Sequence, residues 1–404
     1  MHAHPQRADA ARGKVALAQV LAHHGAAFRS VNRLVPVQLR AMRAIQACRT
    51  EALGGHIARC EACGRLRYHY HSCRNRHCPT CQTLAKERWL ESRRAELLPV
   101  PYFHLVFTLP HALNALAQGN PRAIYALLFA SVSATLIEFG QNPRWLGGDI
   151  AATLVLHTWG QTLSQHLHLH CLIAGGALGA NNQWIRPRRG FLFPVKALSP
   201  VFRGKFLAGL SRAFDAGRLR LDGSTLVLSE PERRSEFFAR LRQTPWVVFA
   251  KQSLAGPEQV LDYLGRYTHR VAISNHRLVS VTDTAVRFRY KDYAHANARK
   301  VLALQPAEFI RRFLLHILPS GFMRIRHYGL LANRAKRDKL AAARAALDHP
   351  PAAQPRQPES VEAFWLRVAH LDIHRCAHCK AGRMVVISAI LPAAARAPPL
   401  PRSS

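Results

Sequence analysis

Acidic residues are scarce in this sequence. Asp and Glu together number 23 among 404 residues, against 57 Lys and Arg, so the formal net charge at pH 7 is +34. This scarcity counts against a hydrolase whose zinc ion needs acidic ligands beside histidines. The excess of cations instead favours a polyanionic partner, and nucleic acid is the default because each neutralised phosphate releases counterions.

Long apolar runs are also lacking. The longest, Ile124–Ile137, is too short to span a bilayer and is followed by Glu138. The first residues, Met1–Lys14, are polar and contain no apolar segment of the kind found in signal peptides. These observations predict a buried helix at 124–137 and a cytoplasmic protein that does not interact with a membrane.

Nine cysteines are present, and in a cytoplasmic chain they favour metal binding or catalysis over disulfides. Two Cys-x-x-Cys pairs, Cys60/Cys63 and Cys78/Cys81, are separated by 14 residues. Two thiolates from each pair can surround one tetrahedral zinc ion. The spacing therefore predicts one structural zinc site made of all four cysteines.

Other potential zinc ligands leave alternatives open. Cys48, His56, Cys73 and His77 lie close enough in sequence to replace one of the four cysteines or to form a second site. Near the C-terminus, the pair Cys376/Cys379 has the spacing of half a zinc site, which His370 or His374 could complete. The remaining cysteine, Cys171, is predicted to be a small buried residue.

Histidines alternate with leucines in the segment His166-Leu-His168-Leu-His170. On a β-strand this alternation places all three imidazoles on one face. Imidazoles two residues apart can reach one divalent cation, and they suit Mn, Ni, Fe, Co or Zn. The segment is predicted to pair in a hairpin with a strand at 151–157. The alternative to a metal site is that these histidines are ordinary residues on the polar face of a half-buried strand.

Two tyrosines lie four residues apart in a segment that reads as a helix beginning near Pro257. Tyr263 and Tyr267 share a helix face beside Arg266 and Arg270. Core packing is the usual role of such a pair, but these cations make a poor core. A phenol with a pKa near 10 needs neighbouring positive charge or a metal to attack at neutral pH. The tyrosines and histidines therefore predict a centre that nicks single-stranded DNA and leaves a phosphotyrosine linkage.

Basic residues also mark two candidate nucleic-acid surfaces. Arg74 and Arg76 follow a run of tyrosines and histidines between the first two cysteine pairs. Arg287, Arg289 and Lys291 alternate with apolar and aromatic residues, so one face of that strand is basic. We predict that these five residues, with Arg266 and Arg270, contact DNA. The alternative for both surfaces is a solvated basic face.

Several motifs together resemble the transposases of the insertion-sequence-ninety-one family, a rolling-circle group related to replication initiators and relaxases. The resemblance extends from about residue 60 to 337. The segments that carry it are SCRNRHCPTCQ, YFHLVFTLPH, HTWGQTLSQHLHLHCLIAGG, YLGRYTHRVAISNHRL and LPSGFMRIRHYGLL. They resemble, in order, the family's zinc-binding domain, first nuclease motif, two-histidine motif, tyrosine motif and C-terminal signature.

The resemblance implies that His168 and His170 bind Mg²⁺ or Mn²⁺, with His166 an upstream extra. It also implies that Tyr263, Tyr267 or both cleave one DNA strand and transfer it through a 5′-phosphotyrosine. One departure is Leu167, where proline is expected. The third metal ligand is left open between the side chains of Gln161, Glu258 and Asp262.

We therefore predict an α+β fold, with a central antiparallel sheet and a tyrosine-bearing helix of the HUH nuclease type. The predicted domains are a zinc-binding, DNA-contacting domain at 1–98, a catalytic domain at 99–347 and a Pro-rich linker and tail at 348–404. The predicted partners are single-stranded DNA at the ends of a mobile element and target DNA, encountered in the cytoplasm at the nucleoid. The rival hypotheses are a non-catalytic zinc-dependent DNA-binding protein and a zinc hydrolase. The sequence does not define an oligomeric state.

Overall fold

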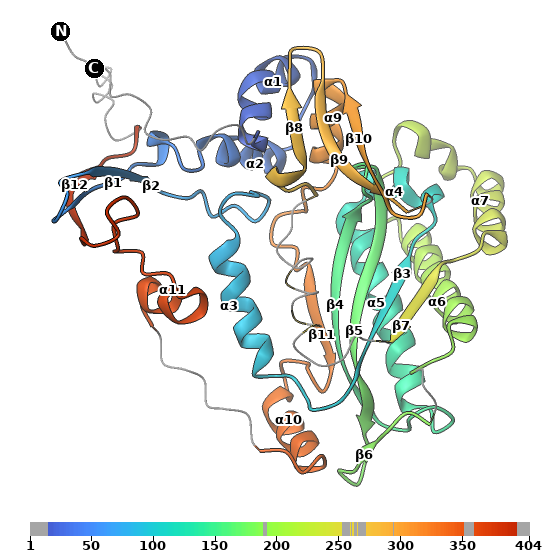
Figure 1. Cartoon of the computed structure of the whole chain (residues 1–404). Coiled ribbons are helices and arrows are strands. Elements are labelled where there is room, and N and C mark those ends of the chain that lie inside the picture. The colour runs from blue at the N-terminus through green and yellow to red at the C-terminus, as the bar shows by residue number, and fades with distance from the viewer. Residues whose placement is uncertain are drawn as a thin grey trace, which may run out of the picture.

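The computed structural model describes residues 15–188, 192–252, 272–293, 295–350 and 359–393, together with Gln259, Leu261 and Gly265. In these residues the strands form three antiparallel sheets (Figure 1). The strands are β1 (Gly55–Cys60), β2 (Leu66–Tyr70), β3 (Tyr102–Thr108), β4 (Asp149–Trp159), β5 (Gln165–Leu178), β6 (Trp184–Ile185), β7 (Val248–Gln252), β8 (Leu278–Val281), β9 (Val286–Asp292), β10 (Ala298–Leu304), β11 (Ile325–Gly329) and β12 (Met384–Ile390).

Helices pack around these sheets. The α-helices are α1 (Leu17–Val31), α2 (Pro36–Ala47), α3 (Thr83–Arg94), α4 (Asn114–Gly119), α5 (Pro121–Gln141), α6 (Val195–Asp215), α7 (Pro231–Gln243), α9 (Pro306–Leu314), α10 (Lys336–Ala345) and α11 (Val361–Ala369). Short 3₁₀ turns are η1 (Glu51–Leu53), η2 (His111–Leu113), η3 (Gly223–Ser229) and η4 (Asn275–Arg277).

The central sheet has the strand order β11-β4-β5-β3-β7, and β6 pairs with the end of β5. Every pairing in this sheet is antiparallel. The predicted hairpin is confirmed as β4 and β5, whose register places His157 opposite His168. The α+β class and the central antiparallel sheet are thus confirmed.

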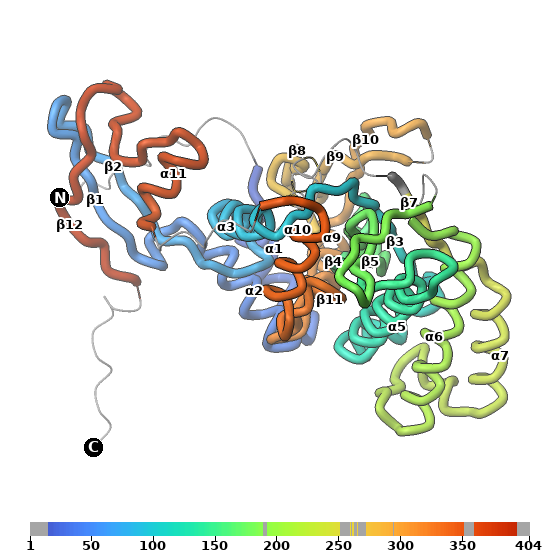
Figure 2. Tube along the Cα trace, turned by 90° about the horizontal axis from the view of Figure 1, so that it is seen from below, coloured from blue at the N-terminus to red at the C-terminus, as the bar shows by residue number. Residues whose placement is uncertain are grey.

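One face of the central sheet is apolar because alternate residues of β5 point into the main core. Leu167, Leu169 and Cys171 are fully buried there. Helices α5 and α6 cover this face, and the rings of Phe107 on β3 and Phe202 on α6 meet edge to face at 5.2 Å. Figure 2 shows both helices on one side of the sheet, with α3 and α10 away from them.

Helix α5 contains the apolar run that the sequence predicts to be a buried helix. Among the described residues it is the one helix long and apolar enough to cross a membrane by length and composition. Most of that stretch is buried, however, and Leu128, Phe129 and Val132 lie in the main core. The burial confirms the prediction of a core helix.

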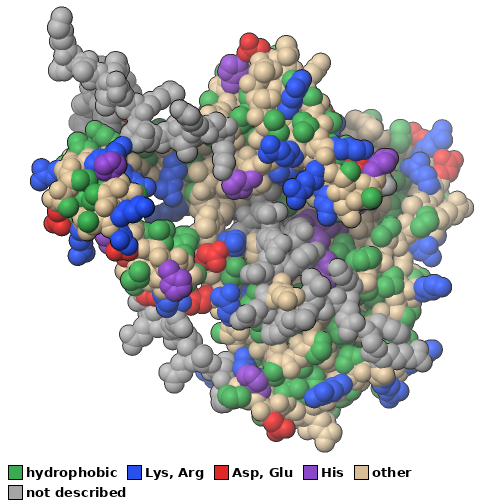
Figure 3. Space-filling model, in the orientation of Figure 1, with side chains coloured by type: hydrophobic (Ala, Val, Ile, Leu, Met, Phe, Trp, Pro, Cys, Tyr) green, Lys and Arg blue, Asp and Glu red, His purple; other side chains and the backbone are tan. Residues whose placement is uncertain are grey.

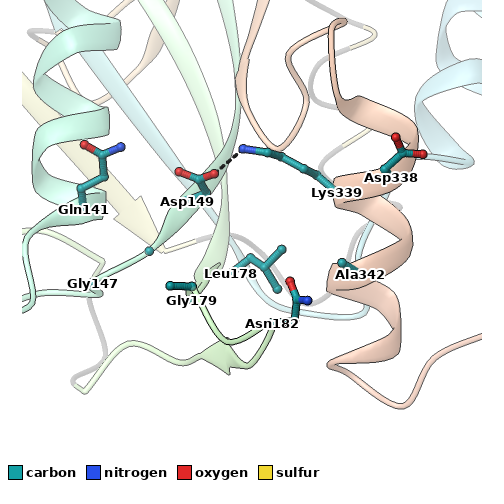
Figure 4. A pocket seen from close by; sticks show the side chains of 11 residues that line it. Gln141, Gly147, Asp149, Leu178, Gly179, Asn182, Asp338, Lys339 and Ala342 are labelled. Carbon is teal, nitrogen blue, oxygen red and sulfur yellow. Dashed lines mark hydrogen bonds and ion pairs between the residues drawn. The ribbon is translucent and has the colours of Figure 1, made fainter.

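The opposite face of the sheet is covered by α3 and α10. The Arg344 guanidinium of α10 donates to the carbonyl oxygens of Ala95 and Leu97, just beyond the end of α3, at 2.9 and 2.8 Å. An ion pair between Lys339 and Asp149 joins α10 to the start of β4, beside a cavity of about 500 Å³ (Figure 4). These contacts attach the C-terminal helices to the end of the sheet remote from the histidines.

The predicted boundary at residue 98 does not separate two cores. Leu21 of α1 and Met42 of α2 share one core with Phe288 of β9 and Phe309 of α9. The predicted tail is likewise not a separate unit, because β12 pairs with β1 in the three-stranded sheet β12-β1-β2. The N-terminal helices therefore share a core with β9 and α9, and the C-terminal strand belongs to the same sheet as β1 and β2.

We expect Leu136→Ala in α5 to lower the free energy of unfolding by about 2–5 kcal/mol, because Leu136 is buried in the main core and its loss leaves a cavity. Leu366 of α11 is 55% exposed and serves as the matched control. Leu366→Ala should change stability by less than about 0.5 kcal/mol. Urea denaturation followed by tryptophan fluorescence measures both, and equal losses would contradict the assigned core.

Candidate active site and metal centres

Three histidines converge on the polar face of the central sheet. His168 and His170 on β5 are buried, and His157 of β4 lies directly opposite His168. One ligand atom from each of the three lies within 4.8 Å of the other two. This separation is short enough for one divalent cation to contact all three imidazoles.

His157 is a candidate ligand that sequence reasoning missed. Its signal was present, because antiparallel pairing of the predicted hairpin brings the end of the first strand beside the start of the second. Gln161, one of the three candidates for the third ligand, donates to the Tyr293 hydroxyl at 3.3 Å and accepts from the Lys291 N–H at 3.5 Å. The other two candidates, Glu258 and Asp262, lie outside the described residues.

Neighbouring groups orient the imidazoles. His168 donates from Nδ1 to the carbonyl oxygen of His166 at 2.8 Å, which leaves Nε2 as its available ligand atom. His170 Nδ1 lies 2.9 Å from Nε2 of His104 on β3, and the two rings stack. His157 stacks on Trp159 with ring centroids 4.6 Å apart. Hydrogen bonds of this kind to ligand histidines fix ring orientation in metal sites.

Burial favours the neutral form of His168 and His170. It lowers the pKa of His168 to about 3 and holds the pKa of His170 well below its usual value, with neighbouring histidines adding to both effects. Neutral imidazole is the form that binds metal. His166 lies outside the group of three, and its Nδ1 is 3.1 Å from Nε2 of His111.

The predicted nucleophiles Tyr263 and Tyr267 lie outside the described residues, as do Arg266 and Arg270. Their described neighbours Gln259, Leu261 and Gly265 are helical, and Leu261 is buried. A Cβ atom at Gly265 would lie 2.8 Å from the side chain of Leu90 in α3. At this position the chain therefore passes closely against α3.

The cysteines form two clusters, which corrects the predicted single zinc site. Cys78 and Cys81 group with Cys48 and Cys73, and the sulfurs of Cys73 and Cys81 are 3.7 Å apart. Tetrahedral zinc with sulfur ligands at 2.3 Å requires sulfur separations of about 3.8 Å. Hydrogen bonding to Cys73 and Cys78 lowers the pKa of Cys48 to about 7, which favours the metal-binding thiolate.

Cys60 and Cys63 instead group with Cys376 and Cys379. The sulfurs of Cys60 and Cys379 are 3.6 Å apart, and those of Cys63 and Cys376 are 3.9 Å apart. The expected completion of the C-terminal pair by His370 or His374 is thus replaced by cysteines. Cys171 is buried outside both clusters, as predicted.

The basic residues predicted to contact DNA occupy different environments. Arg74 is exposed, whereas Arg76 is half-buried and donates to the carbonyl oxygen of Phe322 at 2.8 Å. Arg76 thus joins the first cysteine region to the segment before β11.

On β9, the side chains of Arg287, Arg289 and Lys291 are exposed, while Val286 and Phe288 are buried. Arg299 of β10 pairs with Lys291 and extends the same face. Figure 3 shows Lys and Arg side chains gathered over β8–β10, with histidine side chains below them. We call Arg287, Arg289, Lys291 and Arg299 the basic strip.

The cavity beside Asp149 and Lys339 is not part of this site. It is lined by Leu178, at the far end of β5 from His170. Eight residues of strand separate them, or about 26 Å at 3.3 Å per residue. Chemistry at the histidines cannot reach that cavity.

Comparison with known proteins defines the family. A family model described as "Putative transposase" matches residues 151–339, and one described as "Transposase zinc-binding domain" matches residues 20–109. Over 381 residues the chain is 47% identical to the putative transposase y4qJ of Sinorhizobium fredii, covering 93% of this chain and 96% of that protein. The chain belongs to the IS91 family of transposases. This transposase is also 29% identical over 307 residues to the transposase for insertion sequence element IS801 of Pseudomonas savastanoi pv. phaseolicola, covering 74% and 71% of the two chains. No solved structure matches.

Family membership confirms the predicted resemblance and makes the transposase an enzyme that acts on DNA. The zinc-binding family and the cysteine clusters together support structural zinc. The match to the zinc-binding domain contains Cys48–Cys81 but ends long before Cys376.

We expect His157→Ala to weaken Mn²⁺ binding at least ~10-fold, because it removes one of three converging nitrogens. His168→Ala should do the same. His166→Ala is the matched control, since its ring lies on the same face but outside the group, and affinity should stay within about twofold. Isothermal titration calorimetry with Mn²⁺ measures all three, and a loss in His166→Ala alone would contradict this assignment.

Proposed function

We propose that this transposase nicks and joins single-stranded DNA through Tyr263 and Tyr267, beside a divalent cation held by His157, His168 and His170. The observation that carries the proposal is the convergence of three buried imidazoles on one face of an antiparallel sheet. This arrangement supports the HUH nuclease type. In this chain, His157 on the adjacent strand would complete the ligand set that begins with His168 and His170.

The residues present fit a transition-metal cation. All three donors are neutral nitrogens, and no Asp or Glu joins the group in the described part of the chain. Imidazole suits Mn²⁺ better than Mg²⁺, which prefers oxygen ligands and keeps several waters. We therefore propose Mn²⁺ or Mg²⁺, with Mn²⁺ bound more tightly. Such a cation polarises a phosphoryl oxygen and orients the strand for in-line displacement.

The proposed chemistry conserves the number of phosphate ester bonds. A tyrosine oxygen loses its proton and attacks the phosphorus, forming a bond to the 5′-phosphate while the 3′-oxygen of the preceding nucleotide leaves and gains a proton. Joining reverses this step, with a 3′-hydroxyl of another strand displacing the tyrosine. Each step replaces one phosphate ester bond with another, so joining needs no external energy source. The same centre can therefore cut at an element end and seal at a target, as rolling-circle transposition requires.

The basic strip supports a path for the DNA backbone to the histidines. Lys291 at its end lies beside the turn between β4 and β5, where its backbone N–H donates to the Gln161 side chain at 3.5 Å. His166 and His168 follow this turn on β5. Exposed guanidinium and ammonium groups attract phosphates, and Tyr293, 63% exposed, offers a ring on which a base could stack.

In this proposal the partners are single-stranded DNA at the ends of the mobile element and target DNA, in the cytoplasm at the nucleoid. The exposed Arg74 would contribute a further phosphate contact near the first cysteine cluster. Arg266 and Arg270 are proposed to contact DNA beside the tyrosines, while Arg76 is omitted because of its contact with Phe322.

We expect wild-type protein, incubated with labelled single-stranded oligonucleotides carrying the element ends and Mn²⁺, to form a protein–DNA adduct that survives denaturing electrophoresis. The double variant Tyr263→Phe/Tyr267→Phe should form none, because neither remaining ring carries a nucleophilic oxygen. The two single variants identify which tyrosine attacks first. His168→Ala should lower adduct formation at least ~100-fold.

Tyr328→Phe is the matched control, since Tyr328 lies on β11 outside the group of histidines, and its adduct yield should equal that of the wild type. Labelling the 5′ and 3′ ends separately shows which side of the break carries the protein. Zinc-dependent DNA binding without an adduct, for every end sequence, would reject the proposal in favour of a non-catalytic DNA-binding protein.

A further inference from the structure

The cluster of Cys60, Cys63, Cys376 and Cys379 has the geometry of a complete metal site. Its two measured sulfur separations, 3.6 and 3.9 Å, bracket the value of about 3.8 Å that tetrahedral zinc imposes. Both distances are far too long for disulfide bonds, and all four thiols are free. The two pairs come from opposite ends of the sequence.

The two pairs also share one backbone conformation. In the first, the N–H of Gly64 donates to the Cys60 carbonyl at 2.9 Å; in the second, the N–H of Lys380 donates to the Cys376 carbonyl at 2.9 Å. Gly64 and Lys380 occupy the same position after their pairs, and both adopt positive φ, +71° and +57°. This left-handed conformation is unfavourable for a non-glycine residue, so Lys380 adopts it because the surrounding structure requires it.

Close approach of the two pairs depends on Gly382. A Cβ atom at this position would lie 2.4 Å from the Cys60 sulfur and 2.6 Å from the Cβ of Ala62. The Gly382 N–H also donates to the Cys379 sulfur at 3.3 Å. The backbone at Gly382 therefore lies against one sulfur of each pair.

The sheet β12-β1-β2 has almost no apolar core of its own. Its buried cluster consists of Ala58, Cys60, Cys376 and Met384. Val386 and Ile387 of β12 are 59% and 48% exposed. A core of this size is too small to stabilise the sheet by itself. Small domains with such cores are commonly stabilised by a bound metal ion.

We propose that Cys60, Cys63, Cys376 and Cys379 bind a second structural zinc ion, which fastens the C-terminal strand to the N-terminal sheet. The first zinc ion belongs to Cys48, Cys73, Cys78 and Cys81. The second site is independent of the proposed nicking chemistry, because its ligands lie outside the histidine group.

This second zinc ion also has a mechanical consequence for α11, which precedes the C-terminal pair. Arg367 of α11 forms an ion pair with Glu91 of α3 at 2.7 Å, and Arg88 of α3 lies over the Phe364 ring at 5.5 Å. The segment is thus held at α11 by α3 and at Cys376 by the metal. Without the zinc ion, the contacts with α3 and the pairing of β12 with β1 would still hold this segment.

The double variant Cys376→Ser/Cys379→Ser tests the proposal in the full-length protein. A His168→Ala background with excess Mg²⁺ keeps zinc out of the histidine group. Zinc measured by plasma mass spectrometry should fall from two ions per chain to one. Iodoacetamide mapping should then find Cys60 and Cys63 reactive, while Cys78 and Cys81 stay protected.

Cys171→Ala is the control, because it removes the one thiol outside both clusters and should retain two zinc ions. Continued protection of Cys60 and Cys63 in the double variant would overturn the proposal. If all thiols become reactive in the double variant, loss of folding could explain the result. The test is then pulsed alkylation of the unsubstituted chain while a chelator removes zinc. Cys60 and Cys63 should react in step with Cys376 and Cys379, and reaction in step with Cys78 and Cys81 would overturn it.

A pair of glycine substitutions gives an independent prediction. Gly382→Ala should accelerate release of one zinc ion to a chelator at least ~10-fold, because the new methyl group displaces the Cys60 sulfur. Gly204→Ala on α6 is the matched control, as its Cβ would meet nothing within 4 Å, and should leave both release rates unchanged. Unchanged release in Gly382→Ala would overturn the close approach on which the site depends.

Discussion

The register of the β4–β5 hairpin is the constraint on which the candidate active site depends. It places His157 opposite His168 and leaves Leu167 and Leu169 in the main core on the other face. A slip of one residue would exchange the two faces, placing imidazoles against α5 and leucines on the opposite face of the sheet. The apolar core therefore fixes the face that carries the histidines. The free energy that holds the leucines inside also holds the three candidate ligand nitrogens close to one another.

The local sequence pattern was enough to predict the strands of this site, but not all of the histidines that come together there. The alternation in 166–170 predicted the histidine face, and the hairpin followed from two apolar strands around a turn. His157 needed the register, which could have been inferred from the same hairpin. His104 could not, since β3 pairs with β5 across more than sixty residues of sequence. The tyrosine assignment remains a prediction that rests on the motif.

The cysteines show why proximity in sequence misled. Two pairs separated by 14 residues satisfy tetrahedral zinc on paper, so no distant ligand was needed. In the folded chain the two pairs lie in different clusters. Cys78 and Cys81 group with Cys48 and Cys73, whereas Cys60 and Cys63 group with Cys376 and Cys379. Only the pairing of β12 with β1 reveals this exchange, and no local signal in the sequence encodes that pairing.

Charge links the composition to the site. Each candidate ligand in the histidine group is a neutral nitrogen donor, so a cation bound there would keep its full charge. Carboxylate ligands would cancel that charge and repel the phosphates that the strip attracts. A chain with 23 acidic and 57 basic residues avoids this conflict throughout its length. The scarcity of Asp and Glu, which first argued against an acid-ligated hydrolase, therefore agrees with the proposed imidazole-ligated centre for a polyanionic strand.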